Sequence, residues 1–290
     1  MNGILIVDKP EGWTSHDVVA KLRGALKEKR IGHGGTLDPM ATGVLPLFVG
    51  RGTRAVEFME AADKEYEAGL RLGIVTNTQD TTGLVLEERA VNVSEEDIKA
   101  ALLSFLGESE QLPPLYSAIK VKGKKLYEYA RAGKDVERSP RKIYISRAEP
   151  LGWQGEEYRF RIVCSKGTYI RTICHDLGEK LGCGAAMSYL RRTRAGAYSI
   201  NEALSLEKII EAAEKGQAER LLRKVDSLFS EYPPLRLDSG RERICRNGGS
   251  FSADDIKDGT YRLYNQGSEF LALAKAEKGL IKIIKSFYEV

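Results

Sequence analysis

The chain has 290 residues, 42% hydrophobic and 30% charged, which is typical of a globular protein with a sizeable core and excludes a disordered or fibrous one. The net charge of +4 is modest, so any polyanion site must come from an uneven distribution of charge. The sequence contains no stretch with the length of a membrane span, and the apolar run after Met1 is short, so we expect a cytoplasmic protein with no membrane partner.

The first part of the chain predicts short strands and one helix before a glycine-rich loop. Residues 3–7 and 44–49 are apolar enough for buried strands. Apolar residues at helical spacing predict a helix from Ser15, the expected cap, to about Arg30. Residues 64–72 alternate apolar and polar side chains, which indicates a half-buried strand with Tyr66 near its start.

The loop at residues 32–45 reads Gly-His-Gly-Gly-Thr-Leu-Asp-Pro-Met-Ala-Thr-Gly-Val-Leu. Its glycines permit tight folding and close backbone approach, and Pro39 restricts Asp38 to an extended conformation. A carboxylate held on a rigid loop beside His33 is a candidate for chemistry. The alternative is an Asp-Pro turn in which the side chain caps a nearby N–H.

The second half predicts further strands and helices. Ser94 and Asp97 mark the start of a helix, residues 158–164 alternate as a strand, and a helix over 170–181 stops at Gly182. After a linker at 231–234, short strands separated by glycine turns predict a small β-barrel-like unit. The four cysteines lack CxxC spacing, so we expect buried free thiols rather than a metal or redox motif.

Positive charge is concentrated between residues 120 and 147, where ten Lys or Arg face three acidic residues. Tyrosines are interleaved with them, which favours nucleic-acid binding, because aromatic rings stack on bases. A solvated basic face is the alternative. Few apolar residues lie here, so the segment is predicted to be an extended, mobile insertion. Arginines at 191, 192 and 194 form a second, smaller basic cluster.

Five motifs, in this order, closely resemble those of the bacterial tRNA pseudouridine-55 synthase family (TruB). They are Lys-Pro-Glu-Gly-Trp-Thr-Ser at 9–15, the loop at 32–45, Lys-Glu-Tyr at 64–66, Cys-Ser-Lys-Gly-Thr-Tyr-Ile-Arg at 164–171 and Leu-Arg-Arg-Thr at 190–193. The resemblance implies an α+β fold with a mixed, largely antiparallel sheet and flanking helices, and a small C-terminal β-barrel similar to the PUA domain. The expected boundaries are 1–231 for the catalytic domain, with a basic thumb at about 113–147, and 232–290 for the PUA-like domain.

The resemblance also implies an activity. A uridine at position 55, in the T arm of tRNA, is isomerised to pseudouridine: the base flips out, its C–N bond breaks, and a C–C bond forms. No cofactor or metal is implied, and a monomer is expected. Three alternatives remain: a guide-RNA-directed pseudouridine synthase component, a non-catalytic RNA-binding protein, and a base-excising glycosylase.

Residue roles follow from the same resemblance. Asp38 matches the essential aspartate, acting at C1′, at C6 or on a sugar proton, and Arg171 is its counter-ion. Tyr66 matches a pocket residue and is a candidate acceptor for the C5 proton.

Substrate binding is assigned to three further residues, and support to two. His33 matches a residue that wedges into the space left by the flipped base, Tyr169 lines the uracil pocket, and Leu190 contacts the uracil edge through its backbone. Lys9 and Asp80 are support candidates. Asn77 departs from the family's Thr-Asp-Thr-x-Asp run, in which an Asp holds its place.

Overall fold

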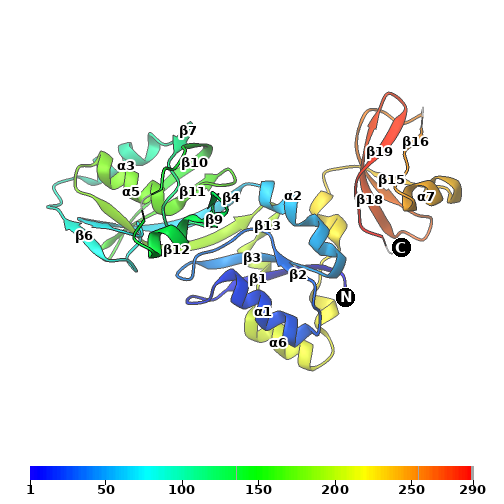
Figure 1. Cartoon of the computed structure of the whole chain (residues 1–290), viewed down its shortest axis with the longest axis horizontal. Helices are drawn as coiled ribbons and strands as arrows, with labels where there is room; N and C mark the ends of the chain where they lie inside the picture. The colour runs from blue at the N-terminus through cyan, green and yellow to red at the C-terminus, as the bar shows by residue number, and fades with distance from the viewer. Residues whose placement is uncertain (135, 254, 289–290) are drawn as a thin grey trace.

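The computed structural model describes residues 1–134, 136–253 and 255–288, so Asp135, one of the three acids counted in the basic segment, lies outside it. The described residues form a large and a small β-sheet that lie side by side along the long axis of the molecule (Figure 1). Each has its own hydrophobic core, and a third cluster of buried residues joins the two.

The large sheet is mixed and largely antiparallel, as predicted. Along its main path the strands run in the order β14 (Leu204–Ser205), β1 (Gly3–Lys9), β3 (Thr42–Val49), β12 (Ala185–Ala195), β4 (Lys64–Leu72), β11 (Glu157–Cys164), β10 (Arg141–Gln154) and β7 (Gly107–Gln111). β2 (Ile31–His33) pairs with β3, and β13 (Tyr198–Ser199) pairs with β12. The β1–β14 and β3–β12 pairs are parallel and the other pairs antiparallel.

Helices flank this sheet. They are α1 (Ser15–Leu26), α2 (Val56–Ala61), α3 (Glu95–Leu103), α5 (Ile170–Lys180) and α6 (Leu206–Glu214). α5 packs on β12, α3 on β10, and α1 against α6 (Figure 1). Short 3₁₀ helices η1 (Gly50–Ala55), η2 (Ile200–Glu202), η3 (Ala218–Leu221) and η4 (Val225–Phe229), and a hairpin of β5 (Ile74–Thr76) with β6 (Val85–Glu88), complete this part.

Three predicted helix ends can be compared with the structure: both ends of α1 and the start of α3. The cap of α1 is Thr14, which forms a capping box with Asp17, so the prediction of Ser15 as the cap was wrong by one residue. The helix also ends at Leu26 rather than near Arg30, because Lys27 adopts the left-handed conformation. The predicted cap at Ser94, with Asp97, is confirmed.

The C-terminal part is a five-stranded sheet with its own core, which confirms the PUA-like prediction. Its strand order is β15 (Pro234–Arg236), β17 (Gly259–Tyr264), β18 (Phe270–Glu277), β19 (Leu280–Ser286) and β16 (Phe251–Ser252). The helix α7 (Ser239–Arg246) was not predicted. Its sequence has few apolar residues, and only Cys245 is buried.

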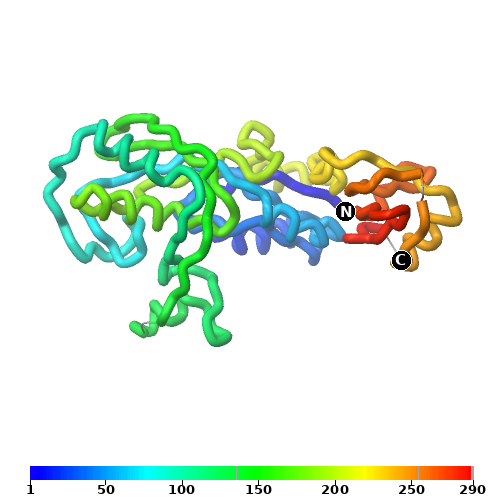
Figure 2. The backbone as a smooth tube through the Cα atoms, turned by 90° about the horizontal axis from the view of Figure 1, so that it is seen from above, coloured from blue at the N-terminus to red at the C-terminus, as the bar shows by residue number. Residues whose placement is uncertain are grey.

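The basic insertion projects away from the large sheet as an arm (Figure 2). It is only partly extended: β8 (Lys120–Val121) and β9 (Lys124–Lys125) form a small hairpin, followed by α4 (Leu126–Arg131), where Leu126 is buried. Its mobility stays a prediction. All four cysteines are free and buried, as expected. No helix in the described part of the chain is long and apolar enough to cross a membrane.

Candidate active site

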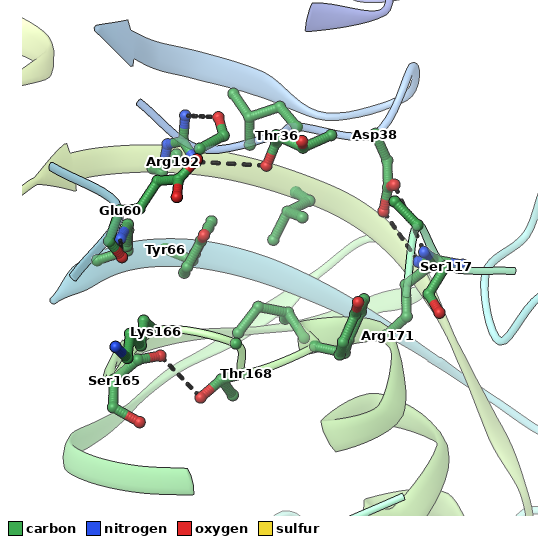
Figure 3. A pocket seen from close by; sticks show the side chains of 18 of the residues that line it. Thr36, Asp38, Glu60, Tyr66, Ser117, Ser165, Lys166, Thr168, Arg171 and Arg192 are labelled. Carbon is green, nitrogen blue, oxygen red and sulfur yellow. Dashed lines mark hydrogen bonds and ion pairs between the residues drawn. The ribbon is translucent and has the colours of Figure 1, made fainter. Parts of the chain in front are cut away.

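A pocket of about 730 Å³ opens beside the central strands β4 and β12 (Figure 3). The glycine-rich loop forms one wall, the start of α5 another, and the base of the arm a third. Among the predicted site residues, the lining includes Asp38, Tyr66, Tyr169, Arg171 and Leu190. The fold therefore brings together residues that lie more than 100 positions apart in the sequence.

Asp38 and Arg171 form an ion pair at this pocket. Nε of Arg171 lies 2.9 Å from Oδ2 of Asp38, and Nη2 donates to Oδ1 at 3.4 Å. The arginine side chain is 6% exposed and the aspartate 35%, so the carboxylate remains open to a ligand while its counter-ion is buried. The permanently charged guanidinium faces the carboxylate with two of its nitrogens.

Arg171 is itself fixed by the loop between β5 and β6 and by the base of the arm. Its two terminal nitrogens donate to the carbonyls of Thr78, at 3.1 Å, and Tyr116, at 2.9 Å. Asp80 lies 3.9 Å from Nε and is held by hydroxyls of Thr78 and Thr82. Asp80 therefore lies in the same charged network as Asp38, with both carboxylates near Nε of the arginine.

Two buried side chains, Ser15 and Lys9, fix the conformation of the glycine-rich loop. Ser15, the residue mistaken for a helix cap, is buried: its hydroxyl accepts from the N–H of Leu37 at 2.8 Å and donates to its carbonyl at 3.2 Å. Lys9, also buried, donates to the carbonyls of Pro10, Trp13 and Pro39, and so ties the N-terminal turn to the residue after Asp38. Burial lowers the pKa of Lys9 to about 8.

Glycine is required at the end of this loop. Gly43 has a φ of +102°, and a Cβ there would lie 2.2 Å from the carbonyl oxygen of Arg192. The loop and β12 can therefore approach each other only with a glycine at this position.

Tyr66 lies on β4 and is 9% exposed. Burial raises the pKa of its phenol, and the positive charge of Arg192 works in the opposite direction. Arg192, which the sequence shows only as part of a second basic cluster, is 1% exposed and lines the pocket. The sequence carried no signal that separated it from its neighbouring arginines.

Tyr169 is held by a residue that sequence analysis missed. The buried side chain of Gln111, at the end of β7, accepts from the N–H of Tyr169 at 2.8 Å and donates to its carbonyl at 3.0 Å. Leu190 is buried on β12, next to β4 in the sheet. Gln111 thus connects the base of the arm with the start of α5.

His33 lies at the end of β2, outside the pocket lining of the described residues. Its Nδ1 is buried without a partner, and burial lowers the pKa of the imidazole, so the ring is neutral at pH 7. The structure therefore brings together the other predicted catalytic and binding residues, but not His33.

A pocket in which the carboxylate of Asp38 is paired with a buried arginine beside tyrosine side chains suits chemistry on a flat base. Comparison with known proteins identifies the family to which the chain belongs. Residues 23–170 match the family described as TruB family pseudouridylate synthase (N terminal domain). Residues 171–229 match the tRNA pseudouridylate synthase B C-terminal domain. The chain belongs to the TruB family of pseudouridylate synthases.

Two curated relatives and one solved structure are similar to this TruB member over most of its length. The tRNA pseudouridine synthase B of Lactococcus lactis subsp. cremoris (strain MG1363) is 46% identical over 264 residues, covering 88% of this chain and 80% of the relative. That of Clostridium kluyveri is 41% identical over 295 residues, covering 99% of this chain and 100% of the relative. A chain in the crystal structure of a Cbf5-Nop10-Gar1 complex is 28% identical with a TM-score of 0.75, covering 99% of this chain and 85% of that one.

The TruB pocket is lined by the carboxylates of Asp38 and Glu60 and by arginines, lysines and tyrosines. Among the described residues, no group of three or more His, Cys, Asp or Glu side chains could hold a metal ion. The chemistry that its own side chains offer is acid–base, nucleophilic and electrostatic.

Proposed function

We propose that this protein isomerises uridine 55 in the T arm of tRNA to pseudouridine. The observation that carries the proposal is the Asp38–Arg171 ion pair, whose partly exposed carboxylate faces a pocket walled by Tyr66 and Leu190. Membership of the TruB family and relatives named tRNA pseudouridine synthase B support the substrate.

The reaction needs the base to leave its stack. Flipping costs a few kcal/mol, which a basic surface and stacking side chains offset. In the pocket, the bond between C1′ and N1 of the uracil breaks, the base turns, and a bond between C1′ and C5 forms. C5 loses its proton and N1 gains one, so the reaction is an isomerisation that consumes no second substrate.

The side chains divide this work. Asp38 is the catalytic carboxylate, and Arg171 is its counter-ion. Tyr66 and Tyr169 line the uracil site, Leu190 lies at its floor, and Tyr66 stands where it can exchange the C5 proton. Lys9 and Asp80 support the loop and the arginine. His33, half-buried at the end of β2, is the proposed wedge.

The two sheets suggest a division into a catalytic domain at 1–231 and an RNA-binding domain at 232–290, with the arm at about 113–147 as the thumb. This division is supported by their separate cores. We infer that the protein is cytoplasmic, because the relatives are named for action on tRNA, and that it is a monomer, because one chain supplies Asp38, Tyr66, Tyr169, Arg171 and Leu190 to the pocket.

A guide-RNA-directed component is the second candidate, since solved relatives include a chain in the structure of an H/ACA RNP bound to a substrate RNA containing 2′-deoxyuridine, 26% identical with a TM-score of 0.75. Curated relatives named for tRNA are 41–46% identical, which favours the tRNA enzyme. The two differ in one outcome: only a stand-alone enzyme modifies an unmodified T stem-loop without added RNA or protein.

The test uses such a stem-loop, tritiated at C5 of the target uridine. We expect the protein alone to release tritium without free uracil; free uracil would indicate a glycosylase. Asp38→Asn is expected to abolish release, because the amide carries no negative charge, and to leave binding of the stem-loop within about threefold. Glu88→Gln, an exposed carboxyl-to-amide change on β6, is the matched control. Tritium release by Asp38→Asn at the wild-type rate would refute the role of Asp38.

A further inference from the structure

Arg192 is the largest side chain in the described chain that is almost fully buried, at 1% exposure. Its guanidinium donates to three backbone carbonyls: Nε to Val44 at 2.7 Å, Nη2 to Gly35 at 3.1 Å and Nη1 to Thr36 at 3.5 Å. Two of these carbonyls precede Asp38 in the loop and the third follows it. One planar group therefore spans both ends of the segment that carries the carboxylate.

The charge of Arg192 has no carboxylate partner within residues 1–134, 136–253 and 255–288. Taking an arginine out of water costs several kcal/mol, and carbonyl dipoles offset only part of that cost. A methionine of similar size would fill the same space without it. A charge kept at this cost, lining the pocket, points to a role in the reaction beyond packing.

Besides the three carbonyls, Arg192 interacts with the side chain of Tyr66. The two residues are directly opposite in the antiparallel pair of β4 and β12, so their side chains leave the sheet on the same face. The guanidinium interacts with the phenol and lowers its pKa, against the rise that burial causes. Figure 3 shows Tyr66 and Arg192 together on one side of the pocket and Asp38 with Arg171 on the other.

We propose that Arg192 is a positioning residue of the isomerisation, which holds both ends of the Asp38 loop and orients the phenol of Tyr66. The inference rests on the proposed function. Arg192 would thereby set the distance between the Asp38 carboxylate and the Tyr66 phenol across the pocket. A lysine is not equivalent here, because Arg192 reaches the three carbonyls from three separate nitrogens of a rigid planar fork, whereas a lysine has a single donor nitrogen.

The first test is Arg192→Lys, which keeps the charge and loses the fork. We expect kcat for tritium release to fall about 100-fold, since a small misplacement of a catalytic group has this effect. KM and the affinity for the stem-loop are expected to stay within about threefold, because the substituted group does not bind the RNA backbone. Arg194→Lys, two residues along the same strand and bonded to the carbonyl of Gly196, is the matched control and keeps wild-type kcat.

The second test is a cycle with Tyr66→Phe. If Arg192 acts partly through the phenol, Arg192→Lys costs less in the Tyr66→Phe background than in the wild type. Arg192→Gln removes the charge, so the inflection in the kcat–pH profile that disappears in Tyr66→Phe should move to higher pH. A packing role alone would lower the melting temperature and move neither readout.

The near-UV circular dichroism of each variant establishes that it is folded. If Arg192→Lys is unfolded, Arg192→Gln, which buries no charge, is measured for the same fall in kcat. Wild-type kcat in either folded variant, or additive losses with Tyr66→Phe together with an unmoved pH profile, would overturn the inference alone. A wild-type chain that releases no tritium would instead overturn the proposed function and, with it, this inference.

Discussion

Two buried lysines lie beneath the site, and neither has the role usual for a surface lysine. Lys9 donates to three carbonyls and Lys64 to the carbonyls of Met59, Glu60 and Ala62 at the end of α2. Burial lowers the pKa of each to about 8. Each lysine thus satisfies backbone groups at the cost of desolvating its own charge.

The lowered pKa of Lys9 predicts a pH effect on stability. Between pH 8 and the unfolded value of 10.5, the unfolded chain binds the proton more tightly, so this lysine's contribution to stability rises with pH. Relative to Lys9→Met, the wild-type free energy of unfolding should rise by about 1.4 kcal/mol per pH unit across that window. Urea unfolding of both proteins at several pH values measures it. A difference that is flat from pH 8 to 10 would show that Lys9 is not desolvated.

At the same scale, sequence reasoning reached the residues whose type alone indicates chemistry. Asp38, Tyr66 and Arg171 stand in motifs, and the fold brings them to one pocket. Sequence reasoning missed the roles of Ser15, Gln111 and Arg192. These roles depend on backbone groups that lie near the three side chains only in the folded chain. A serine near a helix start and an arginine in a basic run have commoner explanations, and sequence alone favours those.

At the scale of elements, the predictions succeed where a pattern is local. The strand predicted at 64–72 coincides with β4, because alternation is a property of the strand itself. The pairing of β4 with β12, more than 100 residues later, and the projecting arm depend on contacts that no local pattern encodes. α7 was missed for the opposite reason: its apolar face is too small to give a helical period.

The arm allows a test of its predicted contact with RNA phosphates. Lys122 and Lys124 are exposed on its hairpin, and Lys125 lies beside Tyr127. Changing all three to alanine should weaken stem-loop binding and flatten the slope of log K against log salt by about one unit per lost contact. Filter binding between 50 and 200 mM salt would measure this. Alanines at Lys208 in α6, Lys215 just after α6 and Lys224 just before η4 are the control. An equal slope in both triple variants would return the arm to a solvated basic face.

At the scale of the molecule, aromatic packing joins the two sheets. Phe229, at the end of η4, is 2% exposed and lies edge-on to Phe58 of α2, with ring centroids 5.1 Å apart. It also contacts Phe270 of β18 and Phe287 just after β19, at 6.0 and 5.8 Å. Polar contacts continue the junction: Arg54 donates to Ser286, and Lys285 pairs with Glu57. Phe229 therefore contacts aromatic rings of both parts and lies at the centre of the apolar junction, which the polar contacts extend.

Truncating this side chain should loosen the junction. Phe229→Ala leaves a cavity shared by both sheets, with an expected loss of about 3–5 kcal/mol. Because each sheet keeps its own core, calorimetry should show the single transition split in two, and proteases should cut faster between residues 230 and 234. Phe105→Ala, next to α3 and far from the junction, is the control: it lowers stability without splitting the transition. If Phe229→Ala unfolds in one transition with unchanged cleavage, the two sheets behave as one cooperative unit, and the division at residue 231 is wrong.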